Sequence, residues 1–319
     1  MSAQETARTG GTAPPQAASV DVLMLAYNVA PFISRAIEGV LAQRTGFPVR
    51  LVIAEDGSTD GTRAICERWA QEHPSRITYH PGSSNIGIAA RTVEALGRCT
   101  AKYVAICDSD DYWTDSSKLT AQIGFLEAHP DHGFSYTDVS VISRDGREKT
   151  DDGYDGVRAA YAAGHLFVKL LQGNFINNST TVARRDLLLA LRPNACRDEL
   201  IGDHIRWLQL SMRTKAHFLS PRTTAYRAGG ITSGNVEARN RGVMLSLLGG
   251  LLLEYHRIGL RPGLRERKIL ARKMIGVLVR PGTPARVKPA LLLALFRYLP
   301  AMFQRDPAKA PLRGEHRAA

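Results

Sequence analysis

The sequence predicts an α/β fold, a mostly parallel sheet flanked by helices, followed by a helical C-terminal extension. Three observations lead to this prediction. Short apolar runs rich in Val and Ile alternate with segments of helical spacing along the N-terminal part of the chain, which is typical of a doubly wound parallel sheet. Two of the runs end in acidic clusters, at residues 55–58 and 108–111. Beyond residue 239 the apolar spacing is helical and the composition strongly basic.

Four parallel strands are expected first. They lie at residues 20–26, 49–54, 76–80 and 103–107, where β-branched and aromatic side chains are frequent. Each run is short and apolar, as strands covered on both faces are. We therefore expect one sheet whose carboxyl edge carries both acidic clusters.

Four helices separate and follow these strands. Pro31 opens the first, because its fixed φ suits a first helical turn. Residues 58–60 cap the second, a third runs through Val93 and Leu96, and a fourth spans residues 118–127. The inner face of the second helix is expected to be Ala64, Ile65, the Arg68 stem and Trp69.

The pattern loosens after residue 136, and residues 143–160 read as a polar loop. The later elements are expected as helices at residues 165–171 and 203–212, and strands at residues 179–183, 217–219 and 224–226. No internal repeat is present. The expected organisation is a disordered leader at residues 1–19, a folded unit at 20–238 and a basic helical extension at 239–319.

Charge is distributed unevenly over the 319 residues. The net charge is +12, but residues 239–319 carry 17 Lys and Arg against four Asp and Glu, which leaves the preceding body at −1. This argues against nucleic acid as a partner of the body, because a nucleic-acid-binding fold carries its basic stripe on itself. The leader lacks the apolar core of a signal peptide, and no segment has the roughly 20 apolar residues of a membrane span.

The cysteines fit the same picture. Cys66, Cys99, Cys107 and Cys196 form no C-x-x-C pair and show no metal-like spacing. We expect them to be small buried apolar residues in a reducing compartment, and the protein to be cytoplasmic.

The two acidic clusters indicate a metal and nucleotide site. Carboxylates at the carboxyl ends of parallel strands lie along the edge where open α/β sheets bind ligands. Carboxylates bunched this closely repel one another unless a cation or hydrogen-bond donors intervene.

Six short motifs follow one another in a characteristic order. They are Ala26-Tyr27-Asn28, Glu55-Asp56-Gly57-Ser58-Thr59-Asp60-Gly61-Thr62, Asn85-Ile86-Gly87 with Arg91, Asp108-Ser109-Asp110-Asp111-Tyr112-Trp113, Gly202-Asp203 with Trp207-Leu208, and Tyr226-Arg227 with Ser233. In this order the chain resembles the family 2 glycosyltransferases of the GT-A fold, over residues 20–235. The resemblance implies a donor half at residues 20–140 and an acceptor half at 141–238.

The resemblance implies inverting transfer of a sugar from a nucleotide-diphosphate sugar to a hydroxyl acceptor, in the synthesis of cell-surface polysaccharide or glycolipid. UDP-sugars are favoured by family frequency, and the acceptor is a sugar or a lipid-linked sugar. The implied donor-binding residues are Ala26, Tyr27, Glu55, Asp56, Arg91, Asp108 and Asp110. Asp110 and Asp111 are the implied ligands of Mg²⁺ or Mn²⁺, and Trp113 and Arg227 the implied residues on the acceptor or phosphate side.

Elementary chemistry agrees with a metal at the second cluster. Negative charge grows on the leaving diphosphate as the glycosidic bond breaks, and a divalent cation stabilises charge where it develops. Mg²⁺ uses one or two protein carboxylates together with phosphate oxygens. Simpler roles stay open: Asp108 can merely order its turn, Tyr27 can be a core tyrosine, and Arg91 an exposed helix arginine.

Asp203 is the expected general base. An inverting displacement needs a carboxylate within hydrogen-bond reach of the acceptor hydroxyl, and the start of a helix favours the ionised form. The alternative is an N-cap aspartate. Many relatives have Glu before this Asp, whereas this chain has Gly202, so one carboxylate fewer is available to position the acceptor.

Two other functions compete with glycosyl transfer. A sugar-nucleotide-forming nucleotidyltransferase begins with a Gly-rich basic loop after the first strand, whereas no Lys or Arg occurs here before Arg35 in that segment. A non-catalytic sugar-nucleotide binding module has no need of Asp203. A P-loop NTPase is excluded because no G-x-x-x-x-G-K motif is present.

The extension contains two apolar faces beside basic residues. The first consists of Leu270, Met274, Val277 and Leu278 and is flanked by Arg267, Lys268, Arg272 and Lys273. The second consists of Leu292, Leu295, Leu299 and Met302, opposite Arg286, Arg297 and Arg305. Basic amphipathic helices of this kind lie on anionic membranes, so we expect peripheral binding to the inner membrane face; packing on the protein is the alternative.

Overall fold

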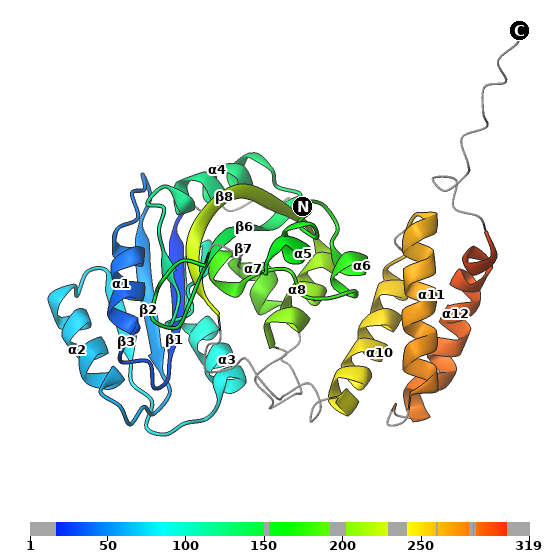
Figure 1. Ribbon diagram of the computed structural model, residues 1–319, viewed down its shortest axis with the longest axis horizontal. Helices are drawn as coiled ribbons and strands as arrows, with labels where there is room; N and C mark the ends of the chain where they lie inside the picture. Colours follow the sequence, from blue (N-terminus) through cyan, green and yellow to red (C-terminus); the bar gives the residue numbers. More distant parts are fainter. Residues whose placement is uncertain are drawn as a thin grey trace, which may run out of the picture.

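A single sheet with helices against it forms the body of the molecule, and three further helices stand in a row at one end (Figure 1). The computed structural model describes residues 17–149, 153–191, 202–228, 241–259, 261–280, 283 and 285–304. Residues 1–16 of the expected leader, Cys196, Ser233 and Arg305 lie outside the described residues.

The sheet has eight strands in the order β3-β2-β1-β4-β7-β6-β8-β5. The first four in this order are parallel, β7 runs antiparallel to both its neighbours, and β8 runs parallel to β6 and antiparallel to β5. The strands are β1 (Val20–Ala26), β2 (Val49–Glu55), β3 (Ile77–His80), β4 (Tyr103–Ile106), β5 (Tyr112–Trp113), β6 (His132–Ile142), β7 (Val182–Arg184) and β8 (Lys215–Arg227). The predicted α/β fold with a mostly parallel first half is confirmed.

The four helices between and after the parallel strands and the helix expected at residues 203–212 lie close to their predicted positions; beyond residue 239 only a helical pattern without individual bounds was expected. The longer helices are α1 (Ile33–Leu41), α2 (Thr62–Glu72), α3 (Ile88–Arg98), α4 (Lys118–Ala128), α8 (Gly202–Arg213), α10 (Arg241–Ile258), α11 (Leu264–Val279) and α12 (Lys288–Phe303). The short ones are α5 (Asp155–Arg158), α6 (Phe167–Leu170), α7 (Arg185–Leu189) and the 3₁₀ turns η1 (Asn178–Thr180) and η3 (Ala285–Val287).

Several details of the sequence prediction are wrong. The strand expected at residues 179–183 is a 3₁₀ turn, η1, followed by the three-residue strand β7, and the 11-residue strand β6 was not expected. The buried residues of α2 are Thr62 and Cys66, whereas Ala64 and Arg68 are exposed, because the Thr62 hydroxyl turns inward and accepts a hydrogen bond from the Val29 N–H at 2.9 Å. Residues 217–219 and 224–226 belong to one strand, β8, rather than to two. Residues 220 and 221 form a bulge in β8, where they have no partner in β6, and pairing with β6 resumes at Arg222.

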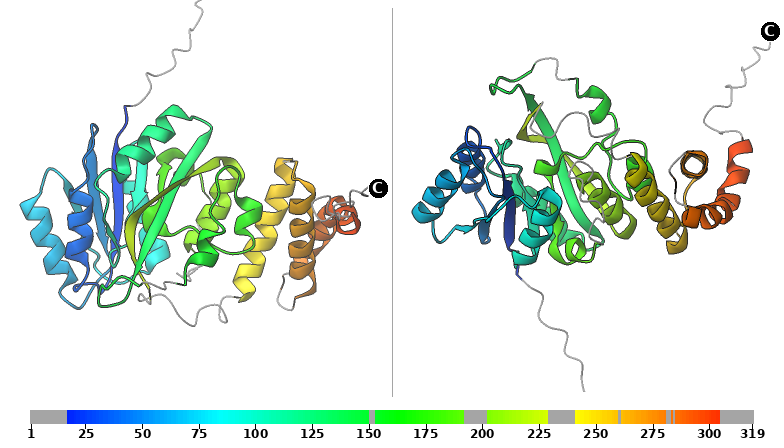
Figure 2. Two further views of the ribbon diagram at one scale, coloured as in Figure 1. Left: turned by 45° about the horizontal axis from the view of Figure 1, so that its top comes forward. Right: turned by 90° about the horizontal axis from the view of Figure 1, so that it is seen from below.

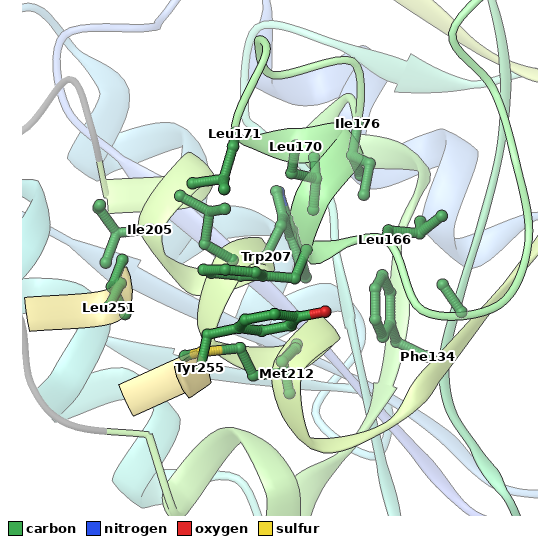
Figure 3. Packing of buried hydrophobic residues seen from close by; sticks show 14 of the residues in the cluster. Phe134, Leu166, Leu170, Leu171, Ile176, Ile205, Trp207, Met212, Leu251 and Tyr255 are labelled. Carbon is green, nitrogen blue, oxygen red and sulfur yellow. The ribbon is translucent and has the colours of Figure 1, made fainter. Parts of the chain in front are cut away.

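The hydrophobic core continues from the sheet into the extension. Trp207 of α8 is fully buried and stacks near Phe134 of β6, with ring centroids 5.8 Å apart. Tyr255 of α10 stacks on Phe167 of α6 at 4.5 Å. Figure 3 shows Trp207, Tyr255 and Met212 together in this part of the core. The sheet and α10 therefore share one core.

The extension packs on the protein through its first predicted apolar face. Leu270, Met274 and Val277 are 0–1% exposed, so this face is buried and the expectation that it lies on a membrane is wrong. The second predicted face is also mostly turned inward: Leu295 is buried and Leu299 and Met302 pack against the core, whereas Leu292 is exposed. Figure 2 shows the three helices of the extension in a row, with α10 nearest α8 and α12 farthest from it. Within the residues described, no helix is both long and apolar enough to cross a membrane.

The described cysteines behave as predicted. Cys66, Cys99 and Cys107 are buried and unpaired thiols. Burial raises the pKa of Cys66 and Cys99 to about 12, so these thiols stay protonated and act as small apolar residues.

Candidate functional site

The predicted donor residues converge on the carboxyl edge of the parallel strands. β1 lies between β2 and β4 in register, so the loops that follow the three strands are neighbours. The loop after β1 is tied to the loop after β2: the Asn28 N–H donates to Ser58 Oγ at 3.1 Å, and the Thr59 N–H donates to Asn28 Oδ1 at 2.9 Å. Asn28 adopts a φ of 51°, a left-handed conformation that asparagine tolerates.

Asp56 and Arg91 form a buried pair at this edge. Arg91 Nε lies 3.0 Å from Asp56 Oδ1, and the backbone N–H groups of Ile86 and Gly87 donate to the same carboxylate at 3.0 Å each. Arg91 also reaches Glu94 at 2.7 Å. The alternative that Arg91 is an exposed helix arginine is wrong, because its side chain is only 7% exposed.

Glu55 points into the loop rather than toward solvent. Its side chain is completely buried and accepts hydrogen bonds from Ser58, from Arg63 Nη2 at 2.9 Å and from the Gly82 N–H at 3.3 Å. These donors hold the pKa of Glu55 below its ordinary value against the opposing effect of burial. The structure thus gives Glu55 a place inside the loop, and its contact with a donor stays a prediction.

Ala26 and Tyr27 end β1 in different environments. Ala26 is buried, and its carbonyl accepts the Asp56 N–H at 2.8 Å. Tyr27 is 40% exposed, so it is no core tyrosine and its ring is available at the edge of the sheet.

Three carboxylates crowd the loop after β4. Burial and mutual repulsion raise the pKa of Asp108 to about 6, and burial raises the pKa of Asp110 and Asp111. Asp108 accepts the Asn178 amide N–H at 2.8 Å. Among the described residues no side chain donates a hydrogen bond to the Asp110 carboxylate, so Asp110 is the acid of this loop best able to take a new ligand.

Asp111 is held inside the loop instead. It accepts the Ser179 hydroxyl at 2.6 Å and the Arg227 backbone N–H at 2.8 Å. Trp113 is buried beneath it, where its Nε1–H donates to the Ser179 carbonyl at 2.7 Å. These contacts fasten β5, β8 and η1 to one another.

The Arg227 guanidinium supports the loop from β8. It donates to the carbonyls of Asp110 at 2.9 Å, Ser143 at 3.1 Å and Arg144 at 2.7 Å, and it lies 4.4 Å from the centre of the Phe32 ring. Roles of Trp113 and Arg227 toward a phosphate or an acceptor stay predictions; in the structure both side chains bind the protein itself.

Asp203 lies in the first turn of α8. Its Oδ1 accepts the His204 N–H at 2.6 Å, and its Oδ2 accepts the Asn174 amide N–H at 3.1 Å. The carboxylate therefore accepts one free N–H of the first helical turn and also contacts a neighbouring loop, and an oxygen retains lone pairs for a further hydrogen bond.

Asp203 and Asp108 line the same cavity. The cavity has a volume of about 300 Å³ and its walls come from the β4 loop, α8, β8 and the segment before β7. Its lining residues are Asp108, Tyr154, Asn174, Phe175, Ile176, Asn177, Asn178, Asp203 and Tyr226. A concave site with convergent carboxylates and carboxamides beside aromatic rings is suited to a polyhydroxylated ligand.

Several of these lining residues were not predicted from the sequence. Tyr154 sits in the segment expected as a plain loop, and Asn174, Asn177 and Asn178 precede the expected strand. The available signal was the run Asn174–Asn178, in which three carboxamides flank a buried Phe-Ile pair. Polar side chains beside buried apolar ones in a loop indicate a site.

The donor set fits a divalent cation bound together with a ligand. In the described part of the chain no group of three or more His, Cys, Asp or Glu side chains is arranged to hold a metal. Mg²⁺, however, takes one or two carboxylates plus phosphate oxygens and water. The Asp110 carboxylate lies beside Asp108 and Asp111, and a cation would relieve the mutual repulsion of the three acids, so this loop satisfies that need.

Comparison with solved structures shows a shared fold. The first 349 residues of TarS from S. aureus match with a TM-score of 0.57 at 16% identity, over 89% of each chain. The mannosyltransferase PcManGT from Pyrobaculum calidifontis, solved with GDP-Man and Mn²⁺, matches with a TM-score of 0.54 at 20% identity, over 91% of this chain and 76% of that one.

Curated relatives match part of the chain. Rv1520 of Mycobacterium tuberculosis, an uncharacterized protein, is 33% identical over 166 residues, 52% of this chain and 47% of its own. TuaG of Bacillus subtilis, named as a putative teichuronic acid biosynthesis glycosyltransferase, is 34% identical over 127 residues, 40% of this chain and 49% of its own. WfaP of Escherichia coli is named as a UDP-Glc:α-D-GlcNAc-diphosphoundecaprenol β-1,3-glucosyltransferase. It is 33% identical over 122 residues, which are 38% of this chain and 46% of its own.

The matches thus span about half the length of these relatives. The family model described as glycosyl transferase family 2 matches residues 21–188. That range contains β1 through β7, the paired acidic loops and Arg91. The chain belongs to glycosyl transferase family 2.

Proposed function

We propose that this protein transfers a sugar, with inversion, from a nucleotide-diphosphate sugar to a hydroxyl acceptor. The observation that carries the proposal is the cavity that is lined both by Asp108 of the loop after β4, which we call the donor loop, and by Asp203 of α8. A UDP-sugar is the favoured donor. TarS has been solved with UDP-GlcNAc and with UDP, and the donor named for WfaP is UDP-Glc.

The donor would lie along the edge of the parallel strands. Tyr27, which is exposed there, would stack on the base, and Asp56 with Arg91 would form the wall that receives it. Ala26 and Glu55 shape this wall from the backbone and from inside the loop. Asp108 would accept a hydrogen bond from a ribose hydroxyl, while the hydrogen bond that it accepts from the Asn178 amide holds its carboxylate in place.

Asp203 performs the proton transfer in this proposal. The acceptor O–H gives its proton to the Asp203 carboxylate as the acceptor oxygen bonds to the anomeric carbon on the face opposite the leaving group. The bond from that carbon to the diphosphate oxygen breaks, and the nucleoside diphosphate leaves with the electron pair.

A bound Mg²⁺ or Mn²⁺ would stabilise the charge of the leaving diphosphate. Asp110 is the residue that we propose to hold it directly. Asp111, predicted from the sequence as a second ligand, already accepts two internal hydrogen bonds, so we propose that it keeps the loop in shape beside the metal.

The base is tested with Asp203→Asn. We expect binding of UDP to stay within about twofold of wild type, while donor hydrolysis and transfer fall by roughly 10²–10⁴-fold, the usual contribution of a general base. UDP-Glc, UDP-GlcNAc and GDP-Man with a panel of soluble and lipid-linked acceptors are the substrates, and NMR reports the anomeric outcome. Wild-type turnover in the variant would mean that Asp203 only caps α8.

The metal ligand is tested with Asp110→Asn by calorimetry of UDP binding. Wild type should bind UDP more tightly with Mg²⁺ or Mn²⁺ than with EDTA. The variant should lose that difference, because a neutral amide is a weaker ligand of a hard cation. If UDP binding depends on the metal equally in the two proteins, Asp110 is not the metal ligand.

The same assays separate the rival functions. A nucleotidyltransferase would release pyrophosphate from a nucleoside triphosphate and a sugar phosphate, whereas a glycosyltransferase releases a nucleoside diphosphate. A binding module would bind the donor without turnover.

We also propose that α12 rests on an anionic membrane at the cytoplasmic side. Of its two faces, one is buried through Leu291, Leu295 and Tyr298, and the other leaves apolar side chains exposed. The exposed set is Leu292 (50%), Leu293 (72%), Phe296 (63%) and Phe303 (84%), which share one side of the helix at 100° per residue.

Charge favours lipid as the occupant of this face. Lys288 and Arg297 flank it, and the extension as a whole has a net charge of +13. Each Lys or Arg near an anionic bilayer contributes about 1 kcal/mol. The lipid-linked acceptor in the name of WfaP supports such a location, in which polysaccharide or glycolipid precursors would be reached from the membrane surface.

Liposome co-sedimentation tests this surface. We expect the full chain to bind vesicles containing anionic lipid in a salt-sensitive manner, and Leu293→Glu/Phe296→Glu to reduce binding by at least tenfold. Leu189→Glu, an exposed leucine on α7 outside the extension, is the matched control and should bind as wild type does. Equal binding by all three proteins would leave α12 without this role.

A further inference from the structure

The segment Asn174–Asn178, which we call the asparagine segment, contacts both acids of the cavity. The Asn174 amide donates to Asp203 Oδ2 at 3.1 Å, and the Asn178 amide donates to Asp108 Oδ1 at 2.8 Å. One short stretch of chain therefore holds the proposed base through one end and a donor-loop acid through the other.

Arg206 decides which way the Asn178 amide points. Its Nη1 donates to Asn178 Oδ1 at 3.1 Å. Arginine has only donors and an ionised carboxylate only acceptors, so the amide oxygen must face Arg206 and the NH₂ must face Asp108. Arg206 lies three residues after Asp203 on α8. The same helix thus presents the base and, through Asn178, orients the donor acid.

The asparagine segment is anchored well enough to transmit this placement. Phe175 and Ile176 are buried, and Asn177 Oδ1 accepts the Ser179 N–H at 3.0 Å. Ser179 in turn connects the segment to the donor loop, because its hydroxyl accepts a hydrogen bond from the Asp108 N–H at 3.0 Å and donates one to Asp111 at 2.6 Å.

We propose that Asn174, Asn178 and Arg206 are positioning residues that fix the donor-loop carboxylate and the base carboxylate relative to each other. This inference rests on the proposed function. Asn174 would act on the chemical step, since it orients the base. Asn178 and Arg206 would act as one unit on donor binding, since both work through Asp108. Small errors in such placement are costly: a displacement of 1 Å can reduce the rate about 10²-fold.

Kinetics of three single variants and one double variant test the division of roles. Asn174→Ala should lower kcat for hydrolysis of the UDP-sugar by roughly 10–100-fold and leave the Kd of UDP with Mg²⁺ within about twofold. Asn178→Ala should weaken that Kd by roughly tenfold, as expected for a lost hydrogen bond to a charged group. Arg206→Met should weaken it similarly, although its side chain is not bonded to Asp108.

The double variant Asn178→Ala/Arg206→Met should bind UDP no more weakly than Asn178→Ala alone, because coupled residues do not add. Arg206→Lys, which keeps a donor, should recover most of the affinity. Arg213→Met removes an arginine of the same helix that pairs with Glu254 and should leave both constants unchanged. Circular dichroism melts of every variant verify that it is folded.

The outcomes separate this inference from the proposed function. A wild-type protein that binds UDP and hydrolyses a UDP-sugar, with additive losses in the double variant or a lowered kcat from Asn178→Ala alone, would overturn the inference and keep the function. A wild-type protein that binds no nucleoside diphosphate would overturn both.

Discussion

At the scale of single residues, the acids in the loop after β4 lower the stability of the folded protein. Three acids lie close together, Asp111 buried and Asp108 and Asp110 partly buried, and the pKa of Asp108 rises to about 6 because burial and Asp110 both oppose its charge. A carboxyl group whose pKa is raised on folding begins to cost stability as the pH rises above its unfolded-state pKa, and the cost is complete above its folded-state pKa. Such a loop gains from any ligand that brings positive charge or hydrogen-bond donors, which is the behaviour expected of a binding site.

Lys118 shows the opposite shift beneath the same loop. It is fully buried, 4.6 Å from the centre of the Trp113 ring, and its ammonium donates to the Thr180 carbonyl at 3.0 Å. Burial lowers its pKa to about 7, against 10.5 for an ordinary lysine. Between these values the unfolded chain binds one more proton than the folded protein, so stability rises with pH by about 1.4 kcal/mol per unit.

We predict that this slope disappears in Lys118→Met. Chemical unfolding at pH 7, 8 and 9 should show the stability of wild type, taken relative to the variant, increasing by about 1 kcal/mol per pH unit. Lys288→Met, which removes an exposed lysine, serves as the control and should stay parallel to wild type. A constant difference between wild type and Lys118→Met across the range would mean that Lys118 titrates normally.

At the scale of elements, the regular parts were predictable because their signal is local. β1, β2 and β4 are apolar runs that end in turn or acidic residues, and α1 carries Ile33, Ile37 and Val40 at helical spacing. The convergence of the two acidic loops followed from the parallel order of the strands. These features require no knowledge of distant contacts.

The elements that complete the site had no such signal. β5 has two residues and β7 three, too few for a period to appear. β7 exists because Val182 pairs with Ala105 and Ser135 on its two sides. The asparagine segment has no period at all, and only the fold shows that Asn174 lies beside Asp203. Residues that close a site across long sequence separations are therefore the ones that sequence reasoning missed.

The sequence also did not show that two adjacent acids, Glu55 and Asp56, would have different partners. Glu55 is the last residue of β2 and Asp56 the first residue after it, yet Glu55 turns inward to Arg63 while Asp56 reaches Arg91. Successive residues of a strand point to opposite faces, which accounts for the division. Their partners lie on α2 and α3 and could not be assigned from spacing.

At the scale of the whole molecule, the sheet and the C-terminal helices form one packed body. Tyr255 of α10 is 5% exposed and belongs to the same core cluster as Trp207, Phe167 and Met212. α8, which carries Asp203, thus lies between the sheet on one side and α10 on the other (Figure 1). The extension stabilises the helix that presents the proposed base.

We predict that the full chain unfolds in one thermal transition and that Tyr255→Ala lowers the midpoint temperature of this transition. Removing a buried aromatic ring costs about 3–5 kcal/mol through lost burial and the cavity left behind, and this loss should reach the sheet because the core is shared. Phe303→Ala removes a ring that is 84% exposed and should leave the transition within about 1 °C of wild type, since surface changes alter stability little. Calorimetry distinguishes the possibilities directly. Two separate transitions, with only the smaller one shifted by Tyr255→Ala, would show that the extension folds independently and that α8 receives no support from it.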